Sequence, residues 1–339
     1  YDPGVGGHRQ GDIDRGRLFR IAPPGTAWRH PSFDFSTVPG AIEGLLSCNR
    51  DARYQGWQKL AESGMSAEQA LNAVFQDNTN PRFRARGLWL LAQLKGRAEY
   101  YIAQATDDPD ENIRIVALRL ARQLQIDLTK TIQKLTRDAS SAVRRECVIA
   151  LCNLDPESRP ALWVPLARSL PEGDRWFLEA LGIAAHGIWD ECGTAFAESI
   201  EANPASSSLT DEILWRSRSQ DSAGLIVERI TQLVQANKTS THDLARWFRA
   251  LDFQNQDLVH APVLSLISDT SLGSLNAELA AFIAAESLSR LHPDRLSDDR
   301  DTPLLLNRVL GHVPLESRIA YIQRFRIVSR YPELTRIIL

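Results

Sequence analysis

The clearest pattern of apolar and polar positions lies between residues 80 and 154, where three segments superimpose at a spacing of thirty residues. Each segment contains, in order, an apolar residue, an arginine, a small residue, a second apolar residue and a closing leucine. The three sets are Phe83, Arg84, Gly87, Leu88 and Leu94; Ile113, Arg114, Ala117, Leu118 and Leu124; and Val143, Arg144, Cys147, Val148 and Leu154. Apolar residues at this spacing lie on one face of an α-helix, and the small residue lets a neighbouring helix approach closely. A period of roughly twenty to fifty residues is typical of solenoids, so the pattern predicts an all-α solenoid of helical hairpins.

Shorter helices are expected between these segments, over residues 97–105 and 128–135. Asp107, Asp108 and Asp138 come just before the next long helix, where a carboxylate accepts hydrogen bonds from free amide groups and opposes the helix dipole. We therefore expect them to cap those helices. The alternation of long and short helices, with its Asp, Val/Ile-Arg, Ala and Leu positions, is similar to that of HEAT-type repeats. A fourth, degenerate copy lies at residues 176–185.

The repeats are expected to occupy residues 41–200, after a linker over residues 26–40 that contains proline and aromatic residues without a period. Helices over residues 40–60 and 66–75 would form the first pair, and the second of them would begin with a capping box at Ser66. Residues 201–339 are predicted to be an irregular α-helical continuation of the solenoid, because the period fades there while helical patterns persist. The helices expected in it cover residues 210–218, 222–236, 241–251, 275–291 and 315–331. Four prolines should end or begin helices: Pro204, Pro262, Pro293 and Pro314.

The first twenty-five residues follow a different pattern, with Gly-rich turns and one alternating strand. The turn runs from Asp2 to His8, and the strand Arg15-Gly16-Arg17-Leu18-Phe19-Arg20-Ile21 is followed by Ala22-Pro23-Pro24-Gly25. These pieces resemble the end of the sugar-dehydrogenase-like β-propeller in the PVC-type membrane-bound dehydrogenase family of planctomycetes and verrucomicrobia. We therefore expect residues 1–25 to be the C-terminal tail of a β-propeller whose other strands lie upstream of Tyr1.

In that family a propeller is followed by HEAT-type repeats and then by a c-type cytochrome domain. The resemblance implies that the partners of this segment are the neighbouring propeller and cytochrome domains, and that the whole protein is periplasmic or membrane-associated. It also implies that haem c belongs to a domain beyond Leu339, since the sequence contains no Cys-x-x-Cys-His motif for haem attachment. No cofactor is expected in the segment itself.

The charge is unevenly distributed along the chain. The formal net charge is −3, but residues 82–145 hold 13 Lys and Arg against 7 Asp and Glu. That basic stretch by itself would suit a HEAT-type DNA-binding protein, which is the third of three hypotheses for the chain. The acidic remainder of the chain argues against nucleic acid as a partner. No run approaches the roughly eighteen consecutive apolar residues that span a bilayer, so no transmembrane segment is predicted here.

Two roles are open for the arginines that recur in the repeats. Arg84, Arg114 and Arg144 would stack along one face and present a basic ladder to an anion. Alternatively, each pairs with an acidic residue of its own or the adjacent repeat, such as Asp108 or Asp138, and holds neighbouring hairpins in register; we favour this structural ladder. Five further arginines have no such pairing pattern and are predicted to face solvent as a candidate interaction surface: Arg82, Arg86, Arg119, Arg122 and Arg145.

The remaining candidates for chemistry are few. The histidines do not cluster at metal-ligand spacing, and Asp12 and Asp14 lack the further oxygen ligands of a calcium turn. The sequence contains no Gly-x-Ser-x-Gly elbow and no phosphate-binding glycine loop after a strand. The four cysteines are expected to be small core residues, and the tryptophans to pack in the core, with a groove lined by some of them as the alternative.

Together these patterns favour a non-catalytic helical-repeat scaffold segment of an exported, dehydrogenase-like, haem-binding multidomain protein. The whole protein would be an oxidoreductase by resemblance. The alternative is a general interaction scaffold whose concave face binds another protein. A Cys-x-x-Cys-His motif downstream of Leu339 in the same reading frame would distinguish the two.

Overall fold

The computed structural model describes residues 23–25, 32–236, 239–270, 272–296 and 301–331. All regular structure in these residues is helical, and no strand occurs among them. The predicted fold class, an all-α solenoid of helical hairpins, is therefore confirmed. The strand predicted within residues 1–25 lies outside the described residues. The chain divides into two compact units, Tyr1–Ser63 and Gly64–Leu339.

The first unit contains two helices that pack on each other, α2 (Val38–Leu46) and α3 (Arg50–Ser63). Asn49 starts the second of them, because its side-chain oxygen accepts the amide hydrogens of Asp51 and Ala52 at 2.9 and 3.1 Å. The single helix predicted over residues 40–60 is therefore wrong. Helix α2 also begins inside the segment predicted to be a linker.

Glycines bring α2 and α3 into backbone contact. A Cβ atom on Gly56 would lie 2.5 Å from the carbonyl oxygen of Ala41 and 2.6 Å from the amide nitrogen of Leu45. On the facing helix, a Cβ atom on Gly44 would lie 3.1 Å from the carbonyl oxygen of Ala52. No residue larger than glycine fits at this crossing without moving one helix.

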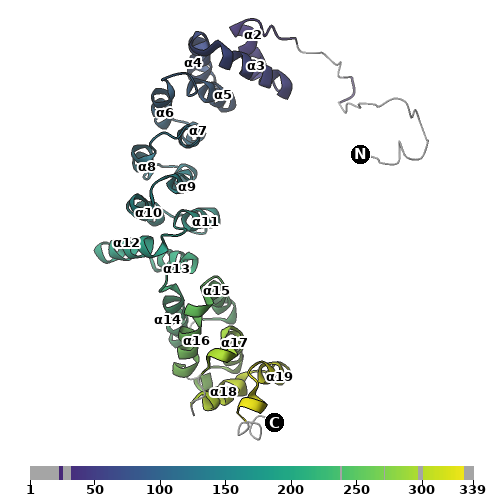
Figure 1. Cartoon of the computed structure of the whole chain (residues 1–339), viewed down its shortest axis with the longest axis vertical. Helices are drawn as coiled ribbons and strands as arrows, with labels where there is room; N and C mark the ends of the chain where they lie inside the picture. Colours follow the sequence, from purple (N-terminus) through teal and green to yellow (C-terminus); the bar gives the residue numbers. More distant parts are fainter. Residues whose placement is uncertain (1–22, 26–31, 237–238, 271, 297–300, 332–339) are drawn as a thin grey trace, which may run out of the picture. The chain divides into compact units, whose positions relative to one another are not determined.

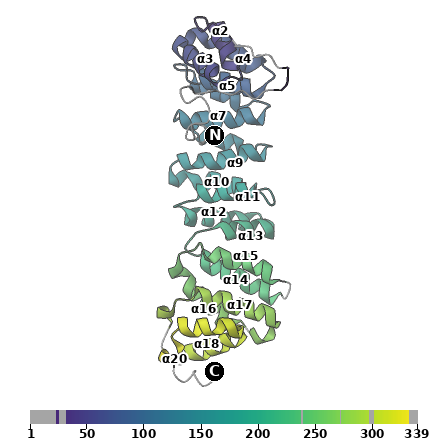
Figure 2. The same ribbon diagram turned by 90° about the vertical axis from the view of Figure 1, so that its right-hand side faces the viewer.

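The second unit is a series of helices joined by short loops and 3₁₀ turns (Figures 1 and 2). Its α-helices are α4 (Glu68–Asp77), α5 (Pro81–Leu91), α6 (Ala98–Thr106), α7 (Glu111–Gln123), α8 (Thr129–Leu135), α9 (Ser141–Ala150), α10 (Arg159–Arg168), α11 (Arg175–Ala184), α12 (Trp189–Ala202), α13 (Ser207–Arg216), α14 (Ser222–Gln235), α15 (Thr241–Leu251), α16 (Gln256–Asp269), α17 (Ala277–Arg290), α18 (Asp301–His312), α19 (Leu315–Arg324) and α20 (Ile327–Arg330). The 3₁₀ turns are η1 (Gly64–Ala67), η2 (Leu151–Asn153), η3 (Pro156–Ser158), η4 (Leu272–Ser274) and η5 (Pro293–Arg295).

The helices of this unit form two layers. In the odd layer, made of the odd-numbered helices from α5 to α17, each helix contacts the next odd-numbered helix. In the even layer, made of α4 to α18, α10 packs on α12 and α14 packs on α16. The hairpins therefore stack as a solenoid requires, with each one touching its neighbours in sequence.

The three sequence repeats begin their odd-layer helices in the same way. The N-cap residues Asn80, Asp110 and Ser140 lie thirty residues apart, and each side chain accepts an amide hydrogen of the following turn, at 3.0, 2.8 and 3.4 Å. Two residues earlier, Asp108 and Asp138 accept the amide hydrogens of Asp110 and Ser140 at 2.9 and 2.8 Å. The prediction that these two aspartates cap the helices directly is wrong: they hold the turn that precedes the cap.

Other helix boundaries also differ from the predictions. The helix predicted over residues 315–331 is divided into α19 and α20, because Arg326 between them has a left-handed backbone conformation. The capping box at Ser66 does not form, because α4 starts after Ala67 and has no side-chain cap. Pro262, predicted to interrupt a helix, lies inside α16, where its missing amide removes one backbone hydrogen bond. The packing of α16 on both α14 and α17 offsets that loss.

The core of the second unit lies between the two layers. At the repeat positions Ile113, Ala117 and Leu118 of α7 are fully buried, as are Val143 and Cys147 of α9. In α7 and α9 the register read from the repeat is therefore the one that the structure adopts, whereas Phe83, the equivalent residue of α5, is only half-buried.

Trp163 occupies the centre of the core where α10 to α12 meet. It is fully buried, and its Nε1–H donates to the carbonyl oxygen of Leu181 at 3.0 Å. Its ring meets Trp189 and Phe196 of α12 edge to face. This cluster anchors α12 on α10.

Candidate functional site

The arginines at the repeat position tie each odd-layer helix to the loop before the next one. Arg84 pairs with Asp108. Arg114 binds Asp138 through two hydrogen bonds of 2.8 Å, from Nε to Oδ2 and from Nη2 to Oδ1. Arg144 has no carboxylate at the equivalent place and donates to the hydroxyl and carbonyl oxygens of Ser169, at 3.1 and 3.3 Å. The guanidinium groups are thus engaged within the solenoid.

The Arg114–Asp138 pair is well shielded from solvent, with side chains 15% and 7% exposed. Arg114 Nη1 also donates to the carbonyl oxygens of Asp108 and Pro109 at 2.7 and 3.0 Å. Burial by itself would raise the pKa of Asp138, but the hydrogen bonds from Arg114 and from the Ser140 amide hold that pKa below its ordinary value. The carboxylate is therefore ionised at neutral pH and fully hydrogen-bonded.

Three of the arginines predicted to have no pairing pattern form ion pairs with the neighbouring odd-layer helix. Arg119 and Arg122 of α7 both pair with Glu146 of α9, at 2.9 and 3.3 Å. Arg145 of α9 lies 3.8 Å from Asp174, the N-cap residue of α11. The prediction that these residues lack partners is wrong, although the side chain of Arg119 is 56% exposed and so faces solvent as predicted. Arg119 and Arg122 pair because Glu146 is buried between the helices, with a side chain only 7% exposed, and a buried carboxylate requires partners.

The same kind of pair continues along the odd layer beyond the sequence repeats. Glu179 of α11 pairs with Arg216 of α13 at 2.9 Å, and Glu212 of α13 pairs with Arg246 of α15 at 2.6 Å. At the next step, Arg290 of α17 pairs at 2.8 Å with Asp252, the C-cap residue of α15. We call the set from Arg119 to Arg290 the inter-helix pairs. Sequence reasoning missed those beyond α11 because the period has faded there.

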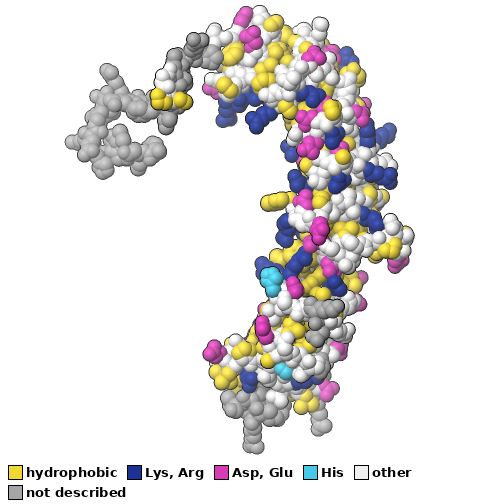
Figure 3. Space-filling model, turned by 180° about the vertical axis from the view of Figure 1, so that it is seen from behind, with side chains coloured by type: hydrophobic (Ala, Val, Ile, Leu, Met, Phe, Trp, Pro, Cys, Tyr) yellow, Lys and Arg dark blue, Asp and Glu magenta, His cyan; other side chains and the backbone are white. Residues whose placement is uncertain are grey.

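Arg82 and Arg86 complete the set predicted to form an interaction surface. Arg82 is exposed, and the guanidinium of Arg86 stacks over the ring of Phe83 at 5.1 Å from its centroid. In the space-filling view of Figure 3, Lys and Arg side chains lie among Asp and Glu side chains along the second unit. The structure thus brings most of the predicted surface arginines beside carboxylates.

A groove of about 800 Å³ lies between α12 and α14, with α13 as its floor. Figure 1 shows α12 along its length, whereas α8 and α10 are seen nearly end-on, so the axis of α12 turns away from those of the earlier helices. Apolar side chains from all three helices line the groove, among them Phe196, Ile213 and Leu225. The described residues that line it include no tryptophan, so it differs from the tryptophan-lined groove considered above.

A smaller cavity of about 250 Å³ is lined by residues of α16, α17 and α19 and of the adjoining loops. Its arginines are engaged: Arg290 binds Glu286 as well as Asp252, and Arg324 donates to the carbonyl oxygen of Leu291 at 3.0 Å. His260 is buried, and its Nδ1 accepts the amide hydrogen of His292 at 3.3 Å. Burial lowers the pKa of His260, so this imidazole is neutral at neutral pH.

The cysteines and tryptophans divide between core and surface. Cys147 and Cys192 are buried, and burial raises the pKa of the Cys192 thiol to about 12, whereas Cys48 and Cys152 are exposed and do not fit the prediction of core residues. Four tryptophans, Trp163, Trp189, Trp215 and Trp247, are buried, but Trp176 is 76% exposed. Among the described residues, no group of three or more His, Cys, Asp or Glu side chains is placed to hold a metal ion.

None of the described helices combines the length and the apolar character that crossing a bilayer requires. The sequence matches no model of a known protein family, and a search of curated proteins finds no match either. The class that the structure defines is an α-solenoid of helical hairpins.

Proposed function

We propose that this chain is a non-catalytic helical-repeat scaffold, the segment of an exported dehydrogenase-like protein that joins a sugar-dehydrogenase-like propeller to a c-type cytochrome domain. The observation that carries the scaffold role is the series of arginine interactions along the odd layer. It consists of the pairs that Arg84 and Arg114 form with the following loops and of the inter-helix pairs from Arg119 to Arg290. In these interactions, charged side chains of the odd layer join one hairpin to the next.

The physical argument rests on how a solenoid is stabilised. Each hairpin contacts only its neighbours, so the stiffness of the array depends on every interface between adjacent hairpins. Arg114 ties α7 to the loop before α9, and Glu146 joins α9 to Arg119 and Arg122 of α7. Two separate attachments at this interface restrict both sliding and opening of α7 against α9. A segment that sets the distance between two other domains needs this property.

The multidomain context is supported by the resemblance of residues 1–25 to a propeller tail. Its test is the reading frame around this segment, which should encode a propeller before the repeats and a Cys-x-x-Cys-His motif after them. A frame without that motif would leave the general interaction scaffold as the better proposal.

The non-catalytic role is tested on purified residues 1–339. We expect no absorbance band of covalently attached haem and no reduction of an artificial electron acceptor when sugars are added, whereas the full-length protein should show both. Dye reduction by the segment above that of a heat-denatured sample would overturn the proposal. A DNA-binding titration at two salt concentrations serves as the control for the third hypothesis, since phosphate contacts would make binding fall steeply with salt.

A further inference from the structure

The groove lies between α12 and α14, which are successive helices of the even layer. On either side of it the even-layer helices pack in pairs, α10 with α12 and α14 with α16. The groove has a volume of about 800 Å³ and is lined by residues of α12, α13 and α14.

The lining residues recur at helical spacing on both walls. On α12 they include Gly193, Ala197 and Ile200, and on α14 they include Leu225 and Gln232. Leu225, in the first turn of α14, is 47% exposed although it is a large apolar residue. An apolar helix surface with spaced anchors is the arrangement that receives the apolar face of an amphipathic helix.

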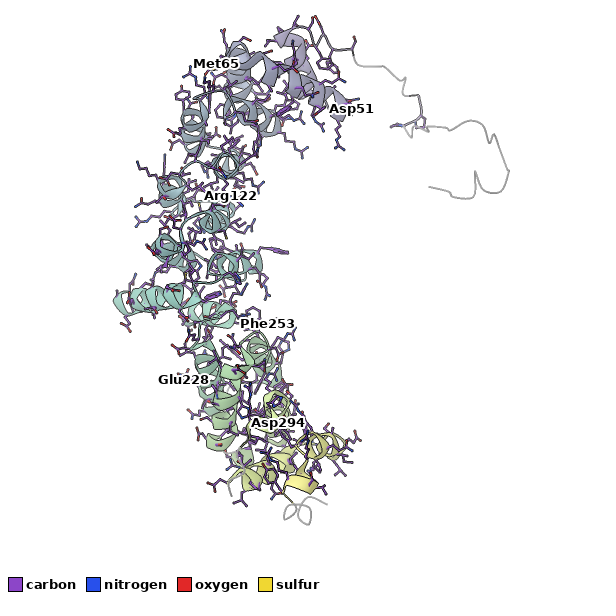
Figure 4. The ribbon with its side chains drawn as sticks, viewed as in Figure 1. Asp51, Met65, Arg122, Glu228, Phe253 and Asp294 are labelled. Atoms are coloured by element: carbon purple, nitrogen blue, oxygen red, sulfur yellow. The ribbon has the colours of Figure 1, made fainter. Side chains whose placement is uncertain are left out.

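The charge of the lining is negative. It contains four carboxylates and one guanidinium, and that guanidinium, on Arg229, is bound to Asp211 at 2.8 Å. Asp190 and Asp221 lie at the N-terminal ends of α12 and α14, where they also oppose the helix dipoles. Glu228 has no such role, because it lies in the middle of α14 and is exposed. Figure 4 places Glu228 and Phe253 on opposite sides of the second unit.

We propose that this groove binds an amphipathic helix of a partner protein that carries Lys or Arg beside its apolar face. The apolar side chains that line the groove on all three helices would contact the hydrophobic side chains of that helix. Asp221 and Glu228 on one wall and Asp190 on the other would face its cationic residues. The negative lining disfavours nucleic acid as the occupant, because phosphates would be repelled. An all-helical wall offers no exposed strand edge, which disfavours an extended peptide.

The probe is a pair of synthetic amphipathic peptides of roughly 18 residues, about five helical turns. Both carry Leu at positions i, i+3, i+4 and i+7; one has Lys and the other Glu beside the Leu face. Binding of each fluorescently labelled peptide to residues 1–339 is measured by anisotropy. We expect the Lys peptide to bind at least about tenfold more tightly than the Glu peptide, and its affinity to fall as salt is raised.

Two variants locate the site, and one controls for charge. Leu225→Ser removes an apolar anchor and Glu228→Lys reverses a charge of the wall, so each should weaken the Lys peptide several-fold. Glu198→Lys makes the same charge change on the exposed surface of α12, outside the groove lining, and should leave binding unchanged. All three residues are exposed, and circular dichroism checks that each variant keeps its helical content.

The result that overturns the proposal takes one of four forms. The Lys peptide does not bind; the Glu peptide binds equally well; Glu198→Lys weakens binding as much as Glu228→Lys; or light scattering shows a dimer of the chain that Leu225→Ser abolishes. The last result would assign the groove to a second copy of this chain. Each outcome leaves the scaffold role to be decided separately by the haem and dye assays.

Discussion

Replacing Arg114 by Ala should destabilise the solenoid by about 2–4 kcal/mol at neutral pH. The change removes two hydrogen bonds to Asp138 and two to the carbonyl oxygens of Asp108 and Pro109. Breaking a fully buried ion pair from one side costs about 3–5 kcal/mol. The estimate is lower because Asp138 keeps its hydrogen bond from the Ser140 amide.

The pH dependence of this loss identifies its cause. In the unmodified chain the pKa of Asp138 lies below its ordinary value, so the contribution of the pair is present above about pH 4 and is lost as the pH falls through the folded-state pKa. In Arg114→Ala, burial without the arginine should raise that pKa above the value in the unfolded chain. The difference in unfolding free energy between the two proteins should therefore be largest at neutral pH and shrink toward about pH 4.

The assay is urea unfolding followed by circular dichroism across that pH range, with hydrogen exchange of α7 and α9 amides to detect local opening of the array. A double-mutant cycle with Asp138→Asn should give a coupling energy of about 1.5–3 kcal/mol. Arg119→Ala is the control: its side chain is 56% exposed and Glu146 keeps Arg122, so the cost should stay within about 1 kcal/mol. A loss at Arg114 that does not change with pH, or that adds to the Asp138→Asn effect without coupling, would refute the reasoning.

Gly56→Ala should destabilise the packing of α2 on α3 by about 1–3 kcal/mol, although Ala is the better helix former, because its Cβ meets the α2 backbone. Gly224→Ala, which has open space around its Cβ in α14, should instead stabilise by about 0.5–1 kcal/mol; hydrogen exchange of each helix checks the opposite signs. Ala117→Leu overpacks a fully buried position and should cost about 1–3 kcal/mol in urea unfolding, so an unchanged midpoint would contradict the register. Burial lowers the pKa of His260 in the folded chain, so the imidazole of the unfolded chain binds a proton at a higher pH. The free energy of unfolding should therefore decrease as the pH falls below about 6.5. His260→Asn should lose less stability over that interval, and parallel pH profiles of the two proteins would count against this account.

Helices and their register could be predicted where the decisive forces are local. Helix α15 covers the predicted residues 241–251, because the capping box at Ser240 and Asp243 and the apolar spacing act within a few turns. The same holds for the buried repeat positions in α7 and α9. Asn49 is itself a local N-cap signal, which outweighs the helical pattern read over residues 40–60 and divides that helix. At Pro262 the local signal failed, because tertiary packing keeps this residue inside α16.

The sequence by itself determined the period of the hairpins, because apolar and small residues repeat with the geometry of one helix face. Only the tertiary structure decided the partners of Arg119, Arg122 and Arg145, since a pair across two helices depends on how each helix is rotated about its own axis. It also decided the groove, which residues of α12, α13 and α14 line together only once the three helices have packed. Helix formation depends on neighbours along the chain, whereas the angle between helices is set by side chains that meet only after the hairpins have stacked.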